Sequence, residues 1–185
     1  RVLSFTGETG WFTIGVASVA GQPAAAADAG PPSPATLSVL RERSSDRSLQ
    51  LVGKLPNAQR PALLGKPGEQ VHGVRLLGNR GYVVTFRQTD PLYVLDLSDP
   101  TDPKAVGELQ MPGFSSHLFP LSDGLLLGVG ADASDRGILG GVKVALFDVA
   151  NPALPRELNS LVIGERGSFT ALSGSPHGLN MFIRA

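Results

Sequence analysis

The chain has 185 residues, with 16 basic and 16 acidic side chains, a formal net charge of zero and no cysteine. The balanced charge argues against a nucleic-acid partner or an anionic membrane surface, and the lack of cysteine excludes disulfides and thiolate chemistry. Hydrophobic residues make up 42% of the chain, and we see neither a signal peptide nor an apolar run of the roughly 20 residues that span a bilayer. The 23 glycines and 15 prolines favour short strands and tight turns over long helices.

The first unit is predicted over residues 11–56. Residues 11–19 form an apolar run that suits a strand, and further strands are expected at 36–40 and 49–55. Between them, residues 20–35 are rich in alanine and proline. This composition excludes a regular element and predicts a long flexible loop.

The second unit is predicted over residues 68–112 and is the best formed. A glycine-bounded turn at 78–81 and two further connections separate four short apolar runs, which predict a four-stranded meander. The expected strands are 72–77, 82–86, 92–97 and 105–109.

The third unit, over residues 113–164, repeats the pattern with strands expected at 117–119, 125–129, 142–149 and 158–163. It differs from the second unit in a longer hairpin loop at 131–141. We expect a fourth unit to begin within 165–185 and to be cut off at residue 185.

The units share a fixed period, in which an apolar run is followed by Asp or Asn before Pro. A constant spacing near 50 residues predicts a repeat architecture, with one supersecondary unit stacked several times. Three landmark pairs each lie 52 residues apart: Asp96 and Asp148, Pro100 and Pro152, and Pro103 and Pro155.

Residues 92–97 are apolar at nearly every position rather than alternately, so both faces of this strand must be buried. A four-stranded unit with doubly buried inner strands, repeated about every 50 residues, is typical of a propeller blade. We therefore predict an all-β fold, a partial β-propeller of about three four-stranded blades plus the start of a fourth.

Residues 65–169 resemble the bacterial C-terminal β-propeller domain proteins, which are described as secreted and as distantly related to WD40 proteins. The resemblance rests on GYVVTFRQTDPL at 81–92, DLSDP at 96–100, PGFSS at 112–116 and LFDV at 146–149. The Asp-x-x-Asn/Asp-Pro ends also look like the LVIVD-type repeats of cell-surface propellers. The resemblance implies an exported bacterial protein, extracellular or in the cell envelope, and carries no catalytic residues over to this chain.

The recurring carboxylates are expected to be structural. Asp99, Asp102 and Asn151 each precede a proline, where such side chains cap turns by accepting from the amide two residues on. Asp96 and Asp148 lie inside apolar strands at the same repeat position. Because a buried carboxylate is costly without a partner, we expect both to bond a neighbouring strand or turn.

No metal or cofactor is predicted. The loop at 132–137 is oxygen-rich, but it lacks the Asp-x-Asp-x-Asp-Gly order and distal Glu of a calcium loop, which favours a solvated hairpin tip. His72, His117 and His177 fall near the starts of units without zinc-binding spacing. Their convergence at a propeller axis stays open.

One polar cluster, Arg87-Gln-Thr-Asp90, has richer chemistry than a turn requires. Arg87, Gln88 and Asp90 are candidate binding residues at a blade rim, together with His72 and His117. The alternative is an Arg–Asp pair that braces the hairpin. No Gly-x-Ser-x-Gly or phosphate loop is present, so no catalytic residue is predicted.

We favour a non-catalytic propeller scaffold that binds a protein or glycan at the bacterial cell envelope. The alternative from another class is a propeller enzyme, or the regulatory propeller of one, with a hydrolase-like site in the axial channel. A third alternative is a truncated gene fragment without independent function. Because three blades leave two open sheet edges, we also expect the isolated chain to self-associate.

Overall fold

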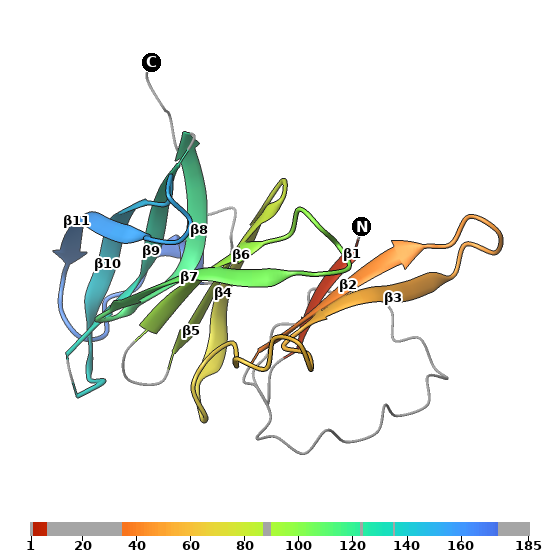
Figure 1. Ribbon diagram of the computed structural model, residues 1–185. Helices are drawn as coiled ribbons and strands as arrows, with labels where there is room; N and C mark the ends of the chain where they lie inside the picture. Colours follow the sequence, from red (N-terminus) through yellow and green to blue (C-terminus); the bar gives the residue numbers. More distant parts are fainter. Residues whose placement is uncertain (1, 7–34, 87–89, 123, 135, 174–185) are drawn as a thin grey trace.

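The computed structural model describes residues 2–6, 35–86, 90–122, 124–134 and 136–173 (Figure 1). In this part of the chain, eleven strands form three antiparallel sheets, followed by the short 3-10 helix η1 (Ala171–Ser173). The first sheet contains β1 (Val2–Thr6), β2 (Thr36–Glu42) and β3 (Leu49–Leu55). The second contains β4 (Gln70–Leu77), β5 (Arg80–Phe86), β6 (Asp90–Asp96) and β7 (Lys104–Met111). The third contains β8 (Phe114–Ser122), β9 (Leu125–Ala133), β10 (Leu139–Asp148) and β11 (Arg156–Ile163).

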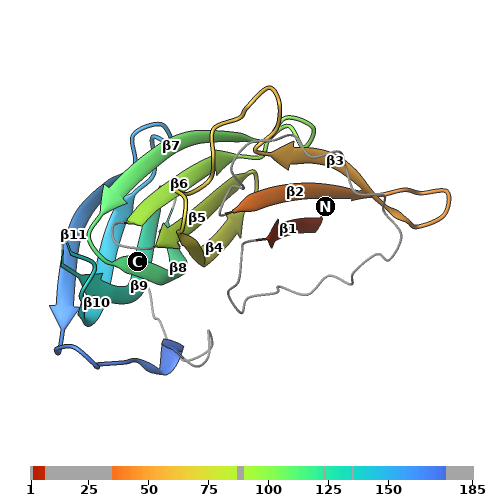
Figure 2. The same ribbon diagram turned by 90° about the horizontal axis from the view of Figure 1, so that it is seen from below.

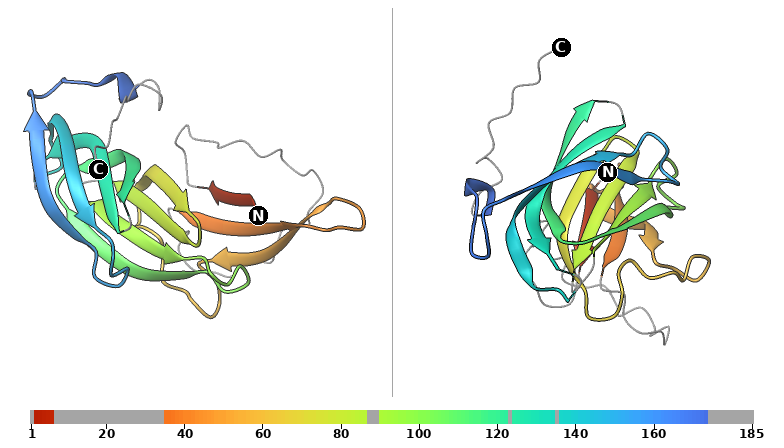
Figure 3. Two further views of the ribbon diagram at one scale, coloured as in Figure 1. Left: turned by 90° about the horizontal axis from the view of Figure 1, so that it is seen from above. Right: turned by 90° about the vertical axis from the view of Figure 1, so that its left-hand side faces the viewer.

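Each sheet is a meander, with its strands paired in chain order. Short turns such as Gly78–Asn79 join neighbouring strands, and Gly78 supplies the positive φ of 56° that this turn requires. The three sheets follow one another along a curved row, with the first at one end and the third at the other (Figures 2 and 3). The predicted fold class, an all-β partial β-propeller, is confirmed.

Two apolar cores hold the row together, one in each space between successive sheets. We call the face of a sheet that points towards the following sheet its outer face. The outer face of the first sheet packs on the second through Leu37, Val39, Leu55, Val83, Tyr93, Leu95 and Leu97. The outer face of the second sheet packs on the third through Tyr82, Val84, Leu92, Val94, Met111, Leu118, Leu126, Ala145, Phe147 and Val149.

The strand β6 contributes to both cores, as its continuous apolar run predicts. Leu92 and Val94 point into the core with the third sheet, while Tyr93 and Leu95 point into the core with the first. Successive side chains alternate between the two faces of a strand, so a strand between two sheets must be apolar at every position. The prediction that both faces of this strand are buried is confirmed.

The first sheet differs from the sequence prediction at its beginning. Residues 2–6, which the predicted first unit of 11–56 left out, form β1 and pair with β2 in the register Val2 to Leu40 through Thr6 to Thr36. The pairing joins segments separated by about 30 residues, and no local signal reveals such a partner. The strand predicted at 11–19 and the loop up to residue 34 lie outside the described residues. Of the fourth unit, the structure describes only residues 165–173.

A repeated backbone contact sets the spacing between sheets. Gly53 of β3 lies against the carbonyl oxygen of Pro100 and the ring of Pro103, in the loop before β7. Gly107 of β7 lies in the same way against Pro152 and Pro155, in the loop before β11. A Cβ at either glycine would overlap the proline carbonyl, so only glycine allows the loop to approach so closely. We call these two contacts the glycine–proline seams.

Candidate functional site

The carboxylates that recur at the ends of β6 and β10 form hydrogen bonds that stabilise the fold. The Asp96 carboxylate accepts a hydrogen bond from the Ser98 amide, and the Asp148 carboxylate accepts one from the Ala150 amide, both at 3.0 Å. These bonds lower the pKa of both aspartates. Arg156 also donates two hydrogen bonds to Asp148, at 2.7 and 3.0 Å. The predicted structural bonds are confirmed.

Asp99 and Asn151 cap the turns that follow, as predicted. The side-chain oxygen of Asp99 accepts from the Thr101 amide at 2.8 Å, and that of Asn151 accepts from the Ala153 amide at 3.1 Å. The same Asx turn therefore recurs after β6 and after β10.

The prediction for Asp102 is wrong. Its carboxylate does not cap a turn but accepts two hydrogen bonds from the Arg60 guanidinium of the preceding inter-sheet segment, both at 2.7 Å. The amide two residues on belongs to Lys104, which already stands opposite Asp96 in the sheet. The Arg60 hydrogen bonds lower the pKa of Asp102 to about 2, with Lys104 contributing from 3.4 Å.

The loops at one end of the sheets keep the same length, whereas the connections at the other end differ in length. The loops from β6 to β7 and from β10 to β11 each contain seven residues, 97–103 and 149–155. At the opposite end, the connections from β1 to β2, from β5 to β6 and from β9 to β10 differ in length: 7–35, 87–89 and 134–138. We call this end of the second and third sheets the hairpin rim, and it includes Phe86, Asp90, Phe114 and 133–139.

Two of the predicted site residues, His72 and Asp90, lie at this rim. His72 lies in β4, with its ring centroid 5.5 Å from that of Phe86 and 4.5 Å from that of Phe114. Burial lowers the pKa of His72, which favours the neutral imidazole. Asp90 opens β6 opposite Met111. Arg87 and Gln88 lie outside the described residues, and so does any Arg87–Asp90 brace.

His117 is not the counterpart of His72, although 45 residues separate them. His72 and Ser116 are the extra residues of matching bulges in β4 and β8, and a further bulge between Pro120 and Ser122, which β4 lacks, shifts the count by one residue. A register shift of one residue moves a side chain to the other face of its sheet. His117 stacks on Phe119 at 6.3 Å, and burial lowers its pKa.

Nothing in the described part of the chain brings three or more His, Cys, Asp or Glu side chains together as a metal site. His177 lies outside that part. In the predicted hairpin tip, the Gly137 amide donates to the Ser134 carbonyl at 2.8 Å, which closes a turn, and Ile138 is exposed. The described segments also contain no helix that is long and apolar enough to span a membrane.

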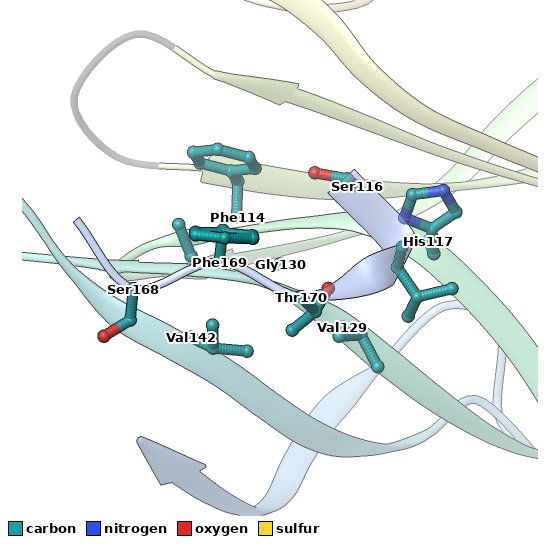
Figure 4. A pocket seen from close by; sticks show the side chains of 11 residues that line it. Phe114, Ser116, His117, Val129, Gly130, Val142, Ser168, Phe169 and Thr170 are labelled. Atoms are coloured by element: carbon teal, nitrogen blue, oxygen red, sulfur yellow. The ribbon is translucent and has the colours of Figure 1, made fainter. Parts of the chain in front are cut away.

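A shallow pocket of about 100 Å³ lies on the outer face of the third sheet, beneath residues 168–172 (Figure 4). Ser116 and His117 line it, and their counterparts in the second sheet are His72 and Gly73. Gly73 is covered by the backbone of β8, the first strand of the next sheet. The pocket therefore lies where a following strand would pack. Its lining is Phe114, Ser116, His117, Val129, Gly130, Ala131, Val142, Ser168, Phe169, Thr170 and Leu172.

Comparison with known proteins agrees with a β-propeller fold. The model of the family described as "Beta propeller domain" matches residues 14–184, and the chain belongs to this family. An uncharacterized protein of Archaeoglobus fulgidus is 42% identical over 120 residues, which cover 65% of this chain and 17% of that protein. The uncharacterized protein MJ1554 of Methanocaldococcus jannaschii is 39% identical over 114 residues, covering 62% and 16%.

The chain thus spans less than a fifth of the length of the curated relatives that it matches. Both relatives are archaeal, so the bacterial origin implied by the resemblance gains no support from them. No solved structure matches the chain.

Proposed function

We propose that the chain is part of a non-catalytic β-propeller scaffold whose hairpin rim binds a protein or glycan partner at the cell envelope. The observation that carries the proposal is the contrast between the two ends of the sheets. Loops 97–103 and 149–155 keep one length, while the connections at the opposite end of the three sheets, 7–35, 87–89 and 134–138, differ in length from sheet to sheet. Loops that vary on a constant scaffold are where binding residues concentrate.

The chemistry of the rim suits contact with a partner. Ile138 is 56% exposed and Leu139 is 42% exposed at the tip of the third-sheet hairpin. The His72–Phe86–Phe114 cluster lies at the same end of the molecule. Aromatic and apolar side chains of this kind provide contact area for a peptide or for the apolar face of a sugar ring.

The recurring carboxylates of the strands and turns have structural partners. Asp96, Asp99 and Asp148 hold turns, and Asp102 is engaged by Arg60. These contacts support a scaffold rather than the alternative of a propeller hydrolase. The envelope location rests on the resemblance to exported propellers. Protease treatment of intact cells of the source organism would test it, because an external domain is digested without lysis.

The binding proposal is tested with two matched variants. The chain and its Ile138→Asp variant are applied to a glycan array and to a display library of envelope proteins. Leu154→Asp, at a residue that is 73% exposed in the constant loop 149–155, is the control. We expect Ile138→Asp to weaken a selected interaction at least tenfold and Leu154→Asp to leave it unchanged.

Equal losses in the two variants would show that the rim is not the binding surface. In parallel, the chain is incubated with peptide, ester and glycan substrates. Turnover that a single substitution abolishes would replace the scaffold proposal with the enzyme alternative.

A further inference from the structure

An open groove at the hairpin rim lies between the β9–β10 turn and the connection that follows β11. The two segments meet because Gly141 lies against the carbonyl oxygen of Gly164. The groove encloses about 530 Å³, within the range of about 300–1,000 Å³ that ligand sites occupy, and it shares no residue with the pocket beneath 168–172. Its lining is Gly137, Ile138, Leu139, Arg166 and Gly167.

Both walls of the groove are additions to the repeated unit. The second sheet joins β5 to β6 through residues 87–89, whereas the third joins β9 to β10 through 134–138. Residues 112–113 alone separate β7 from β8, whereas 164–170 separate β11 from η1. The repeated packing of sheet on sheet needs neither addition. The groove is therefore separate from the scaffold, at an end where binding residues concentrate.

Backbone hydrogen bonds hold both walls in place. In the β9–β10 turn, the Ser134 amide donates to the Ile138 carbonyl at 2.9 Å. In the connection after β11, the Ser168 amide donates to the Glu165 carbonyl at 2.9 Å, and Gly167 supplies the positive φ of 92° that closes this turn. A surface that is formed before contact loses less conformational freedom when a ligand binds.

The groove combines an apolar wall with an arginine that lacks an acidic partner. Ile138 and Leu139 are exposed although both are large and apolar. Arg166, on the other wall, is the charged side chain of the lining. Among the described residues it forms no ion pair, not even with the adjacent Glu165. Its guanidinium is therefore available to donate to the carboxylate of a ligand.

This chemistry distinguishes between classes of ligand. A sugar offers several hydroxyl groups that need matching donors and acceptors, but the lining has one polar side chain and no aromatic ring. An anionic membrane is recognised by clusters of about four to eight basic residues, far more than the single arginine of the groove. A peptide that carries an apolar side chain beside a carboxylate matches both walls.

We propose that this groove binds an acidic peptide segment of a partner protein, with an apolar side chain against Ile138 and Leu139 and an Asp or Glu carboxylate against Arg166. The inference rests on the function proposed for the hairpin rim, and it selects a protein rather than a glycan as the partner. Arg166 sets the specificity, because it determines the charge that the ligand must carry.

The experiment selects peptides from a random display library on the full chain and, in parallel, on its Arg166→Glu variant. We expect the chain to enrich peptides with Asp or Glu beside Leu, Ile or Phe. Arg166→Glu should enrich Lys or Arg in place of the acidic residues, because the charge of the groove is reversed. The control is Arg47→Glu, at an exposed arginine between β2 and β3, which should select the same peptides as the chain.

A selected acidic peptide is then titrated against each protein by fluorescence anisotropy. Arg166→Glu should weaken its binding roughly tenfold or more, since it places like charges together, and Arg47→Glu should leave the affinity unchanged. Binding to the parent chain should also weaken as the salt concentration rises.

Selected peptides without an excess of acidic residues would overturn the inference. So would a peptide whose affinity falls with Ile138→Asp but not with Arg166→Glu, and the rim would then still be the binding surface. A peptide that is insensitive to both substitutions would overturn the inference and the proposed function together. Binding to a glycan array or to phosphatidylserine vesicles that Arg166→Glu abolishes, without selection of acidic peptides, would also overturn it, because the groove would then serve another class of ligand.

Discussion

The substitution Gly107→Ala tests whether the glycine–proline seam fixes the distance between the second and third sheets. The added Cβ would overlap the carbonyl oxygen of Pro152 and lie 3.0 Å from the Cδ of Pro155. Both are parts of a stiff, proline-bounded loop, so neither can rotate away as a flexible side chain would. The second and third sheets must then move apart, which loosens the apolar core between them.

Overpacking of this kind costs about 1–3 kcal/mol. For a chain of this size, each kcal/mol lowers Tm by roughly 2–4 °C, so we expect a decrease of about 2–12 °C. The change is measured by urea and thermal unfolding monitored by circular dichroism. Gly53→Ala, at the equivalent position of the first sheet, should behave alike.

Asn159→Ala is the matched control, because it places the same methyl group at the same register position of β11, where no sheet follows within the described residues. It should change the free energy of unfolding by no more than about 0.5 kcal/mol. If Gly107→Ala lowers the free energy of unfolding by no more than Asn159→Ala does, the glycine contact does not fix the spacing between the sheets. That result would refute the reasoning.

Three further predictions concern charged and titratable groups. The pKa of Asp102 is about 2 in the folded chain, below the ordinary 3.8, so its pair with Arg60 stabilises the fold fully above about pH 4, and this stability is lost as the pH falls through 2. Asp102→Asn should therefore unfold more easily than the parent at pH 6, by a difference that shrinks as the pH falls towards 2 and vanishes below it, whereas a constant difference would exclude the linkage. Burial lowers the pKa of His72 below 6.5, so stability should decrease as the pH falls below 6.5. His72→Leu should reduce that dependence, and an imidazole that titrates above 6.5 by NMR would contradict it. The ammonium group of Lys143 donates to Glu157 at 3.0 Å and to the Pro112 carbonyl at 2.9 Å. Lys143→Met should cost about 3 kcal/mol in urea unfolding, and a neutral result would mean that Glu157 finds another partner.

The sequence was most informative where the physical cause is local. The turns after β6 and β10 were predicted from Asp-Pro and Asn-Pro pairs because an Asx side chain bonds an amide only two residues away. The meander of the second sheet was predictable for the same reason, since its strands are joined by short turns.

The errors occur where distant segments meet. Asp102 was assigned to a turn because its partner, Arg60, lies 42 residues away. His72 and His117 were aligned by counting residues, but β8 has an additional bulge between Pro120 and Ser122 that β4 lacks, and it shifts the count by one residue. The strand β1 was missed because its partner follows a long connection.

By itself, the sequence determined a repeated β-meander with blade-like inner strands, because alternation, turn chemistry and period are properties of short segments. The tertiary structure alone revealed why Gly53 and Gly107 must be glycine, because a loop of the next sheet lies against each of them. In sequence these are two ordinary glycines of edge strands. Whether glycine is required at such a position depends on whether the backbone of the next sheet lies against it, and only the packing of the sheets decides that.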